Sequence, residues 1–346
     1  MDTVLDVVAW VSAVAVVYRL RKYFAWPRKR KAVPATDSIP VSIIIPARNE
    51  AKNLPKVLVS LQRLTFKPKE ILVVDDSSTD NTSAVAAAHG ATVISAGIKP
   101  EGWAGKNWAC HVGAQHASGE LLLFTDADTT HTRTSLARAV KHLQENEADM
   151  LSAPSYHRNE LWWEKLLGPF HCLIHCGASP YDKQSADEAY AVGQYILIKA
   201  DAYDHIGGHL AVRSQVAEDT SLARATIQNG LEYILYTGEP LFTVQMYPTF
   251  IKFCKGWIRL LRLGMRELSF EVSVNSVLPL LALNLQNLYP LTVISYVPIV
   301  VTLVCFAFVQ RHIGNFSVWG LILFPIPIAL FVVLSCWAMV TELLEV

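Results

Sequence analysis

The chain passes from a region of mixed polar and apolar residues into a C-terminal region that is almost continuously apolar. No Asp, Glu, Lys or Arg occurs in residues 272–310 or in residues 312–341. About twenty apolar residues suffice to cross the hydrocarbon core of a bilayer. The pattern therefore predicts two transmembrane helices, at residues 291–309 and 318–340, joined by a polar turn at residues 310–315.

Residues 277–287, just before the first predicted span, are apolar but interrupted. The interrupting residues are Pro279, Asn284, Gln286 and Asn287. Unpaired polar groups are costly in lipid, so an interfacial or buried helix is expected here, with a third full span left as an alternative.

The N-terminus has a shorter apolar run, residues 7–18, followed by seven basic residues within residues 19–31. No small-residue cleavage site separates the two, which favours an uncleaved signal anchor over a secretory peptide. A helix lying on the membrane surface is the alternative. Basic residues next to a span favour the cytosolic side, so the basic segment and the large middle region are predicted to face the cytosol.

Residues 41–153 alternate short β-branched runs with helical stretches. Strands are expected at residues 41–45, 71–74, 91–94 and 121–125, and helices at 51–64, 84–89 and 108–117. Asp80 can cap the second helix and Gly90 can end it. Alternating strands and helices predict a parallel sheet, in which ligands bind at the carboxyl ends of the strands.

Polar residues follow three of these strands. The segments are Pro46-Ala-Arg-Asn-Glu50, Asp75-Asp-Ser-Ser78 and Asp126-Ala-Asp128. A glycine-rich dinucleotide turn is missing after the first strand, and a P-loop is missing as well. Three groups of carboxylates tolerate a diphosphate only with a divalent cation between them, and an Asp-x-Asp pair suits Mg²⁺ or Mn²⁺. A solvated strand end is the plainer interpretation of Asp75 and Asp76.

The ordered series of motifs resembles the inverting family 2 glycosyltransferases of GT-A fold, over about residues 40–265. The motifs are Val41–Glu50, Val74–Asp80, Gly102–Lys106, Thr125–Asp128, Gly193-Gln194, Ile206–His209, Glu218-Asp219, Met246–Pro248 and Gly256-Trp257. Within that family, the chain is most similar to the membrane-anchored branch that includes carotenoid (diaponeurosporenoate) and hopanoid-associated glycosyltransferases.

The resemblance implies roles for individual residues. It assigns the nucleotide-sugar donor to Pro46, Arg48, Glu50, Asp75, Asp76, Lys106 and Asp126, and the metal to Asp126 and Asp128. It also assigns the sugar and acceptor region to Gly193, Gln194, Glu218 and Trp257. As a lone lysine, Lys106 would more often be a surface charge.

Asp219 occupies the position of the family's catalytic base. Inversion requires a carboxylate that deprotonates the acceptor hydroxyl opposite the leaving group, and desolvation would make this carboxylate a better base. Glu218 is expected to support it. Both acids also suit the first turn of a helix expected at residues 220–228.

The chain departs from the processive polysaccharide synthases of the family, which carry Gln/Arg-x-x-Arg-Trp after the base. The nearest equivalent here is Lys255-Gly256-Trp257, which argues against polymer extrusion and leaves the roles of Lys255 and Trp257 open. A basic stripe spaced by three and four residues predicts a helix on an anionic membrane surface, and with Leu161-Trp162-Trp163 it would form a floor for a lipid acceptor. Ordinary packing is the alternative. The stripe consists of Lys252, Lys255, Arg259, Arg262 and Arg266.

Composition narrows the picture further. Thirty basic residues balance thirty acidic ones, which excludes nucleic-acid binding through bulk positive charge. The six cysteines of a cytosol-facing protein are expected to be free thiols. The run from His171 to Cys176 could imitate a metal site, but it lacks a second pair of ligands, and packing is favoured.

These observations predict an α/β protein with a GT-A (Rossmann-like) domain and N- and C-terminal transmembrane helices. The expected segments are a membrane anchor (1–31), a catalytic domain (32–250), interfacial helices (251–290) and two spans (291–346). The expected activity is a metal-dependent transfer of one sugar from a nucleotide-diphosphate sugar, most simply a UDP-sugar, to a lipid-like acceptor at the cytosolic membrane face. A polyprenyl phosphate acceptor and a catalytically silent membrane scaffold are the alternatives.

Overall fold

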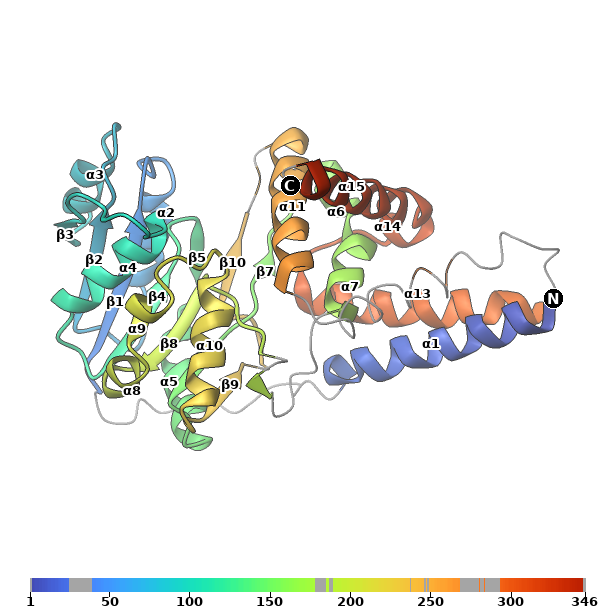
Figure 1. The fold of residues 1–346 in the computed structure, drawn as a ribbon, viewed down its shortest axis with the longest axis horizontal. Helices are drawn as coiled ribbons and strands as arrows, with labels where there is room; N and C mark the ends of the chain where they lie inside the picture. Colours follow the sequence, from blue (N-terminus) through green and yellow to red (C-terminus); the bar gives the residue numbers. More distant parts are fainter. Residues whose placement is uncertain are drawn as a thin grey trace. The chain divides into compact units, whose positions relative to one another are not determined.

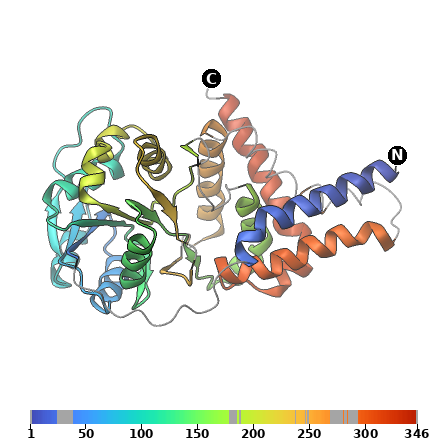
Figure 2. The same cartoon turned by 90° about the horizontal axis from the view of Figure 1, so that it is seen from below.

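The computed structural model describes residues 2–24, 39–177, 185, 186, 189–236, 238–245, 247, 249–267, 280, 283 and 293–344. The chain divides into two compact units. The helical unit comprises Met1–Trp26, His157–Asp182 and Met246–Val346, and the α/β unit comprises Pro27–Tyr156 and Lys183–Gln245 (Figures 1 and 2). Residues 157–182, placed within the catalytic domain from the sequence, thus group with the terminal helices.

The α/β unit is built on a seven-stranded sheet with the order β3-β2-β1-β4-β8-β6-β9. Its strands are β1 (Val41–Ala47), β2 (Glu70–Asp75), β3 (Thr92–Ser95), β4 (Leu121–Thr125), β6 (Met150–Ser152), β8 (Tyr195–Lys199) and β9 (Tyr233–Leu235). Two short strands, β5 (Thr129–His131) and β10 (Phe242–Val244), pair antiparallel beside it, and β7 (Tyr156–His157) ends the unit's first segment.

Helices cover both faces of this sheet (Figure 1). They are α2 (Leu54–Gln62), α3 (Thr82–Ala88), α4 (Gly105–His116), α5 (Ser135–Glu145), α8 (Ala200–His205), α9 (Gly208–Ala211) and α10 (Glu218–Gln228). Successive side chains of a strand point to opposite faces of the sheet, so the α/β unit has two hydrophobic cores. Ile43 and Ile45 pack toward α2 and α5, whereas Ile44 packs toward α4 and α10. The strands and helices expected between residues 41 and 125 are all present, with ends shifted by a few residues.

The parallel arrangement predicted for the strands between residues 41 and 125 is confirmed, but the sheet as a whole is mixed. β3, β2, β1 and β4 run parallel, but β8 is antiparallel to both β4 and β6, so the sheet is mixed. Strand–helix alternation predicts direction only where each crossover is a simple helix. Before β8 the chain instead leaves through residues 157–182 of the helical unit, and that detour removes the constraint.

The helical unit contains α1 (Asp2–Phe24), α6 (Trp162–Leu166), α7 (Gly168–Gly177), α11 (Phe250–Glu267), α13 (Val293–Ile313), α14 (Val318–Ile322) and α15 (Pro325–Leu344). Among the described helices, Tyr296–Ile313 and Pro325–Glu342 are long and apolar enough to cross a membrane. The second span therefore begins at Pro325 and not at residue 318, where it was expected. A proline disfavours helical backbone in the residue before it yet fits a helix's first turn, so Pro325 begins a new helix.

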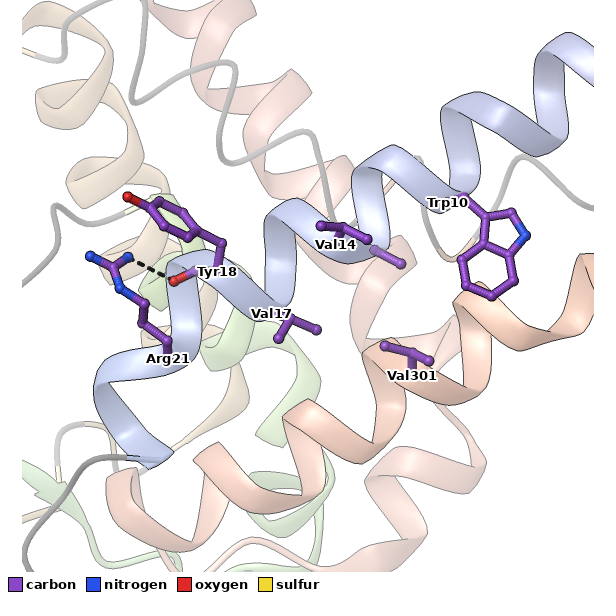
Figure 3. A pocket seen from close by; sticks show the side chains of 7 residues that line it. Trp10, Val14, Val17, Tyr18, Arg21 and Val301 are labelled. Carbon is purple, nitrogen blue, oxygen red and sulfur yellow. Dashed lines mark hydrogen bonds between the residues drawn. The ribbon is translucent and has the colours of Figure 1, made fainter.

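Helix α1 confirms a helical N-terminus, but it is not one of the two helices with the length and composition of a span. It packs along α13 and also contacts α7. Its buried side chains include Ala9, Ala13, Val16 and Leu20. Between α1 and α13 lies a cavity of about 370 Å³ (Figure 3), which is lined mainly by Trp10, Val14, Val17 and Val301. Arg21 stands at its edge, with Cζ 3.9 Å from the centre of the Tyr18 ring.

Within the helical unit, the apolar side of α11 is covered by protein. Phe253 and Trp257 are buried, and Trp257 lies 5.0 Å from Phe170 of α7 between ring centroids. Trp163 packs on Phe250 and Phe253, so this member of the predicted lipid floor is used in packing, whereas Trp162 is 76% exposed. The exposed side chains of α11 include Lys252, Lys255 and Arg259.

The run from His171 to Cys176 lies on α7. His171 contacts the rings of Phe170, Trp257 and Phe316, and the phenol oxygen of Tyr23 lies 2.6 Å from His175 Nδ1. Among the residues that the structure describes, no group of three or more His, Cys, Asp or Glu side chains is placed to hold a metal ion. This run therefore packs among aromatic rings.

Two predictions lie outside the described residues. The interrupted segment at 277–287 is described only at Leu280 and Leu283, and residues 25–31 of the basic segment are not described. The predicted orientation toward the cytosol stays a prediction.

Close packing of α4 on the sheet generates a stability prediction. A Cβ added at Gly113 would lie 2.4 Å from Ile44 Cγ2 and 2.9 Å from Val74 Cγ2. Both contacts are methyl groups of β-branched residues in central strands, which have little rotamer freedom. Replacing Gly113 with Ala should lower stability by about 1–3 kcal/mol despite the higher helix propensity of Ala, measured as a lower Tm in detergent. Gln115→Ala, at an exposed position on the same helix, is the control; an unchanged Tm for Gly113→Ala would contradict this packing.

Candidate active site

The predicted donor residues converge because of strand register. In the parallel pair of β1 and β2, Ala47 lies opposite Asp75, and β4 continues the same direction on the other side of β1. The segments after these strands therefore leave the sheet at one edge, as expected for an α/β ligand site. Pro46 is part of β1, and Asp126 follows β4 directly.

The loops that follow β1 and β2 at this edge are hydrogen-bonded to each other. Asn49 has a left-handed backbone (φ 60°), and its side-chain oxygen accepts from the Thr79 amide at 2.8 Å. The Asn49 amide donates to the Ser78 hydroxyl at 3.0 Å, and the Glu50 amide donates to the Thr82 hydroxyl at 2.8 Å. The Glu50 carboxylate accepts from the side chain of Asn53.

Asp75 and Asp76 differ in what they can offer a ligand. The Asp75 carboxylate accepts from the Ser78 amide at 2.9 Å and from the Ser83 hydroxyl. Although burial acts to raise it, the pKa of Asp75 is lowered by these hydrogen bonds. Asp75 therefore helps to hold its own turn together.

Asp76 is 8% exposed, and its Oδ2 lies 3.7 Å from the Arg48 guanidinium. A Cβ at Gly105 would come within 2.9 Å of the same oxygen. The glycine at the start of α4 thus makes room for the Asp76 carboxylate. Asp76 is a better candidate than Asp75 for a ligand contact.

Lys106 lies at the centre of the charged cluster. Its Nζ is 2.9 Å from Asp126 Oδ1 and 2.9 Å from Glu218 Oε1. Burial acts to lower the pKa of this ammonium, but the two carboxylates outweigh it and hold the pKa well above its usual value. The predicted donor lysine therefore joins the Asp-x-Asp segment after β4 to the first turn of α10, and it is not a lone surface charge.

Asp219 lies beside this cluster, on the first turn of α10. Its carboxylate accepts from the Gly193 amide at 2.7 Å and from its neighbour Thr220's amide at 2.8 Å. Burial, followed by repulsion from Glu218, raises the pKa of Asp219 to about 6, against the opposing effect of Lys106. A carboxylate with such a pKa can accept a proton near neutral pH.

Gly193 is needed for close approach. A Cβ there would lie 3.1 Å from Lys106 Nζ and 3.2 Å from both Asp219 Oδ2 and Glu218 Oε1. The structure thus brings Gly193, Lys106, Asp126, Glu218 and Asp219 into one cluster. The main-chain oxygen of Gln194 accepts from the Thr125 hydroxyl at 2.8 Å, next to the cluster. Trp257 belongs to the helical unit, packed as described above.

Asp126 and Asp128 have the chemistry to hold a divalent cation. Asp128 Oδ1 is buried and has no hydrogen-bond partner among the residues that the structure describes. Burial, with Asp126 and Glu50 nearby, raises the pKa of Asp128 to about 7. No group of three protein ligands exists among the described residues, so two carboxylates would need phosphate oxygens and water to complete the shell, as Mg²⁺ sites commonly do.

Sequence reasoning missed two buried polar residues beside the cluster. Asn107 is 1% exposed and donates to main-chain oxygens of the loop before α10. His131 is 6% exposed, its Nε2 lies 3.1 Å from the Thr125 hydroxyl, and burial lowers its pKa to about 3, which keeps the ring neutral. Asn107 directly follows the motif lysine, but nothing in the sequence reveals its burial.

The raised pKa of Asp219 generates a prediction about stability and pH. A carboxyl group whose pKa is higher in the folded than in the unfolded chain destabilises the fold when it ionises. Asp219→Asn should therefore have a higher Tm than the wild type at pH 8, and the difference should shrink as pH falls through 6 and vanish below about 4, the ordinary Asp pKa. Asp201→Asn, which removes another carboxylate from the first turn of a helix, is the control. A difference that does not change with pH would contradict the raised pKa.

Comparison with known proteins agrees with this geometry. The chain is 30% identical over 230 residues to a 4,4'-diaponeurosporenoate glycosyltransferase of Staphylococcus aureus (strain MRSA252), covering 65% of this chain and 61% of that protein. It is 29% identical over 255 residues to the protein of the same name from Staphylococcus haemolyticus (strain JCSC1435), covering 72% and 67%. The chain thus spans about three fifths of the length of the first of these relatives.

A solved structure shares the fold. The mannosyltransferase from Pyrobaculum calidifontis, solved in complex with GDP-Man and Mn²⁺, aligns over 99% of both chains with a TM-score of 0.57 and 18% identity. Residues 42–207 match the model of the family described as glycosyl transferase family 2. These findings confirm the family resemblance drawn from the motifs: residues 42–207 of the chain match glycosyl transferase family 2, and the fold is GT-A-like.

Proposed function

We propose that this protein is a membrane-bound, inverting glycosyltransferase that moves a single sugar from a nucleotide-diphosphate sugar to a lipid-like acceptor. The observation that carries the proposal is the cluster in which Lys106 bridges Asp126 and Glu218 beside Asp219. In this proposal, the Lys106 ammonium serves the charge that develops on the diphosphate, and the carboxylate with the raised pKa beside it, Asp219, serves the acceptor. Stabilising such developing charge is a large part of enzymatic rate enhancement.

In the proposed reaction, the acceptor hydroxyl attacks the anomeric carbon from the face opposite the diphosphate. Asp219 takes the hydroxyl proton as the new C–O bond forms, and the bond from the anomeric carbon to the diphosphate oxygen breaks. The nucleoside diphosphate leaves with the electron pair. The Gly193 amide donates a hydrogen bond to the Asp219 carboxylate at 2.7 Å and so orients it. The Lys106 ammonium stabilises the negative charge that develops on the leaving nucleoside diphosphate.

Donor binding is assigned to Pro46, Arg48, Glu50 and Asp76 for the nucleoside, with Asp75 holding the turn between them. A divalent cation held by Asp126 and Asp128 would supply charge neutralisation for the diphosphate. The unpartnered Asp128 oxygen supports this assignment, and the GT-A-like mannosyltransferase structure contains both GDP-Man and Mn²⁺. A UDP-sugar remains the simplest donor.

A lipid-like acceptor is supported by two observations. The relatives named above are diaponeurosporenoate glycosyltransferases, and two helices of this chain have the length and composition of membrane spans. We assign the active site to the cytosolic face of a cell membrane, following the basic residues 19–31. A carotenoid acid, a hopanoid or a glycolipid would suit such an acceptor site.

The direct test is nucleoside diphosphate release by the full chain in membranes. With Mn²⁺ or Mg²⁺ and an extract of carotenoid-containing lipids, one donor among UDP-glucose, UDP-N-acetylglucosamine and GDP-mannose should give release and a glycosylated lipid detectable by mass spectrometry. Removing divalent ions with a chelator should abolish release, and adding Mn²⁺ should restore it. Nucleoside diphosphate release that persists in excess chelator would refute the metal assignment. No release with any donor of the panel would refute the proposed glycosyltransferase activity.

The base assignment has its own test. Asp219→Asn should keep its affinity for the donor and lose turnover by about 10²–10⁴-fold, the usual contribution of a general base. In the wild type, kcat should fall as pH drops below about 6, because protonated Asp219 cannot accept the hydroxyl proton. Asp201→Asn is the matched control and should keep full turnover. Turnover retained by Asp219→Asn would instead favour an acceptor that is already ionised and needs no base, such as a polyprenyl phosphate or the carboxylate of a carotenoid acid.

A further inference from the structure

The loop that leads into α10 is attached to the first turn of α4 by one buried amide side chain. Asn107 Nδ2 lies 2.9 Å from the carbonyl oxygen of Val212, 2.8 Å from that of Gln215 and 3.3 Å from that of Arg213. The Ala104 amide adds a fourth hydrogen bond, to the Arg213 oxygen at 2.8 Å. Segment 212–215 is thus held at several points by residues 104–107.

Only a side chain with several N–H donors can make this contact. All three groups facing Asn107 Nδ2 are carbonyl oxygens, which accept and cannot donate, so the NH₂ of the amide must point at them. Asn107 is 1% exposed, and water therefore cannot replace these bonds. Two of the distances are short and the third is longer, as expected when two hydrogens serve three acceptors.

The anchored segment ends three residues before Glu218. α10 begins at Glu218, and Asp219 is its second residue. The neighbouring side chain, Lys106, pairs with Glu218 at 2.9 Å. Two consecutive residues of α4 thus fix both the approach to α10, through Asn107, and its first turn, through Lys106. The position of the Asp219 carboxylate depends on both attachments.

We propose that Asn107 is a positioning residue for the catalytic base: by holding segment 212–215 against α4, it sets where Asp219 meets the acceptor hydroxyl. The inference rests on the proposed function of Asp219. Asn107 contacts the loop before the base and is not assigned to the donor, so its loss should affect the chemical step and leave donor binding intact. A displacement of about 1 Å at a reacting group can cost on the order of 100-fold in rate.

The test compares Asn107→Ser with Asn229→Ser in the full chain, using the donor that the wild type turns over. A serine hydroxyl is too short and has one hydrogen, so it cannot hold three carbonyls. Asn229 also donates to a main-chain oxygen, that of Ala225, but at the far end of α10. Asn107→Ser should lose at least about tenfold in kcat, with the Kd for the nucleoside diphosphate and Mn²⁺, and the donor KM, within about twofold of wild type. Asn229→Ser should match the wild type in kcat and in donor affinity.

A second variant covers the case in which Asn107→Ser does not fold. Ala104 has φ −73°, which a proline can adopt, so Ala104→Pro removes the N–H that donates to Arg213, and its ring displaces the Arg213 oxygen from that 2.8 Å contact. A loss of kcat, again with unchanged donor affinity, is expected.

Unchanged kcat in a folded variant, or a loss of donor affinity that accounts for the whole loss of kcat/KM, would overturn the role. A wild-type protein that releases no nucleoside diphosphate would refute the proposed function itself, and this result is distinct from either outcome.

Discussion

The candidate active site depends on one ion-pair bridge, in which the Lys106 ammonium lies between the carboxylates of Asp126 and Glu218. Asp126 follows β4 and Glu218 begins α10, so the bridge joins parts of the sequence that are 92 residues apart. Without the ammonium, Asp126, Glu218 and Asp219 would repel one another in a partly buried place. Truncating Lys106 would leave these carboxylates without their counter-charge, at a cost that solvent moderates because the Lys106 and Asp126 side chains are 36% and 28% exposed. The cluster is therefore a constraint on the fold as well as a source of chemistry.

The same cluster shows a conflict between stability and function. The raised pKa values of Asp219 and Asp128 mean that both carboxylates are held in places that disfavour their charge. Such residues persist when surrounding structure compensates for them. Here the compensation comes from the two apolar cores on either side of the sheet, which bury Ile43, Ile45 and Ile44 completely. A rigid sheet with a charged edge can keep unfavourable carboxylates close together.

Much of the first half of the fold follows from the sequence because its signals are local. The apolar runs at β1 and β4 and the caps around α3 and Gly90 lie within a few residues of the elements that they define. The antiparallel direction of β8 could not be predicted, because it depends on where the chain returns after residues 157–182. The second span was placed too early because its hydropathy continues across Pro325, although the backbone breaks there.

Prediction of the site was limited in the same way, to residues whose signals are local in the sequence. Asp126, Asp128, Lys106 and Asp219 could be proposed from the sequence because their motifs are compact and ordered along the chain. The contact between Lys106 and Glu218 was not found, since no pattern in one sequence links positions so far apart. Asn107 and His131 were missed for a related reason: their importance comes from burial and from main-chain partners, which leave no residue signature. The roles assigned to individual site residues remain predictions.

The hydrogen bonds between the loops after β1 and β2 have a further consequence. Asn49, Glu50, Ser78 and Thr82 hold these loops together by hydrogen bonds within the protein. A nucleotide entering there would meet walls that have already lost their conformational freedom, so binding would spend little free energy on ordering them. If the proposed donor binds there, discrimination among nucleotides would depend on the fixed positions of these loops, and a donor with a larger base would bind more weakly because making room for it would break these hydrogen bonds.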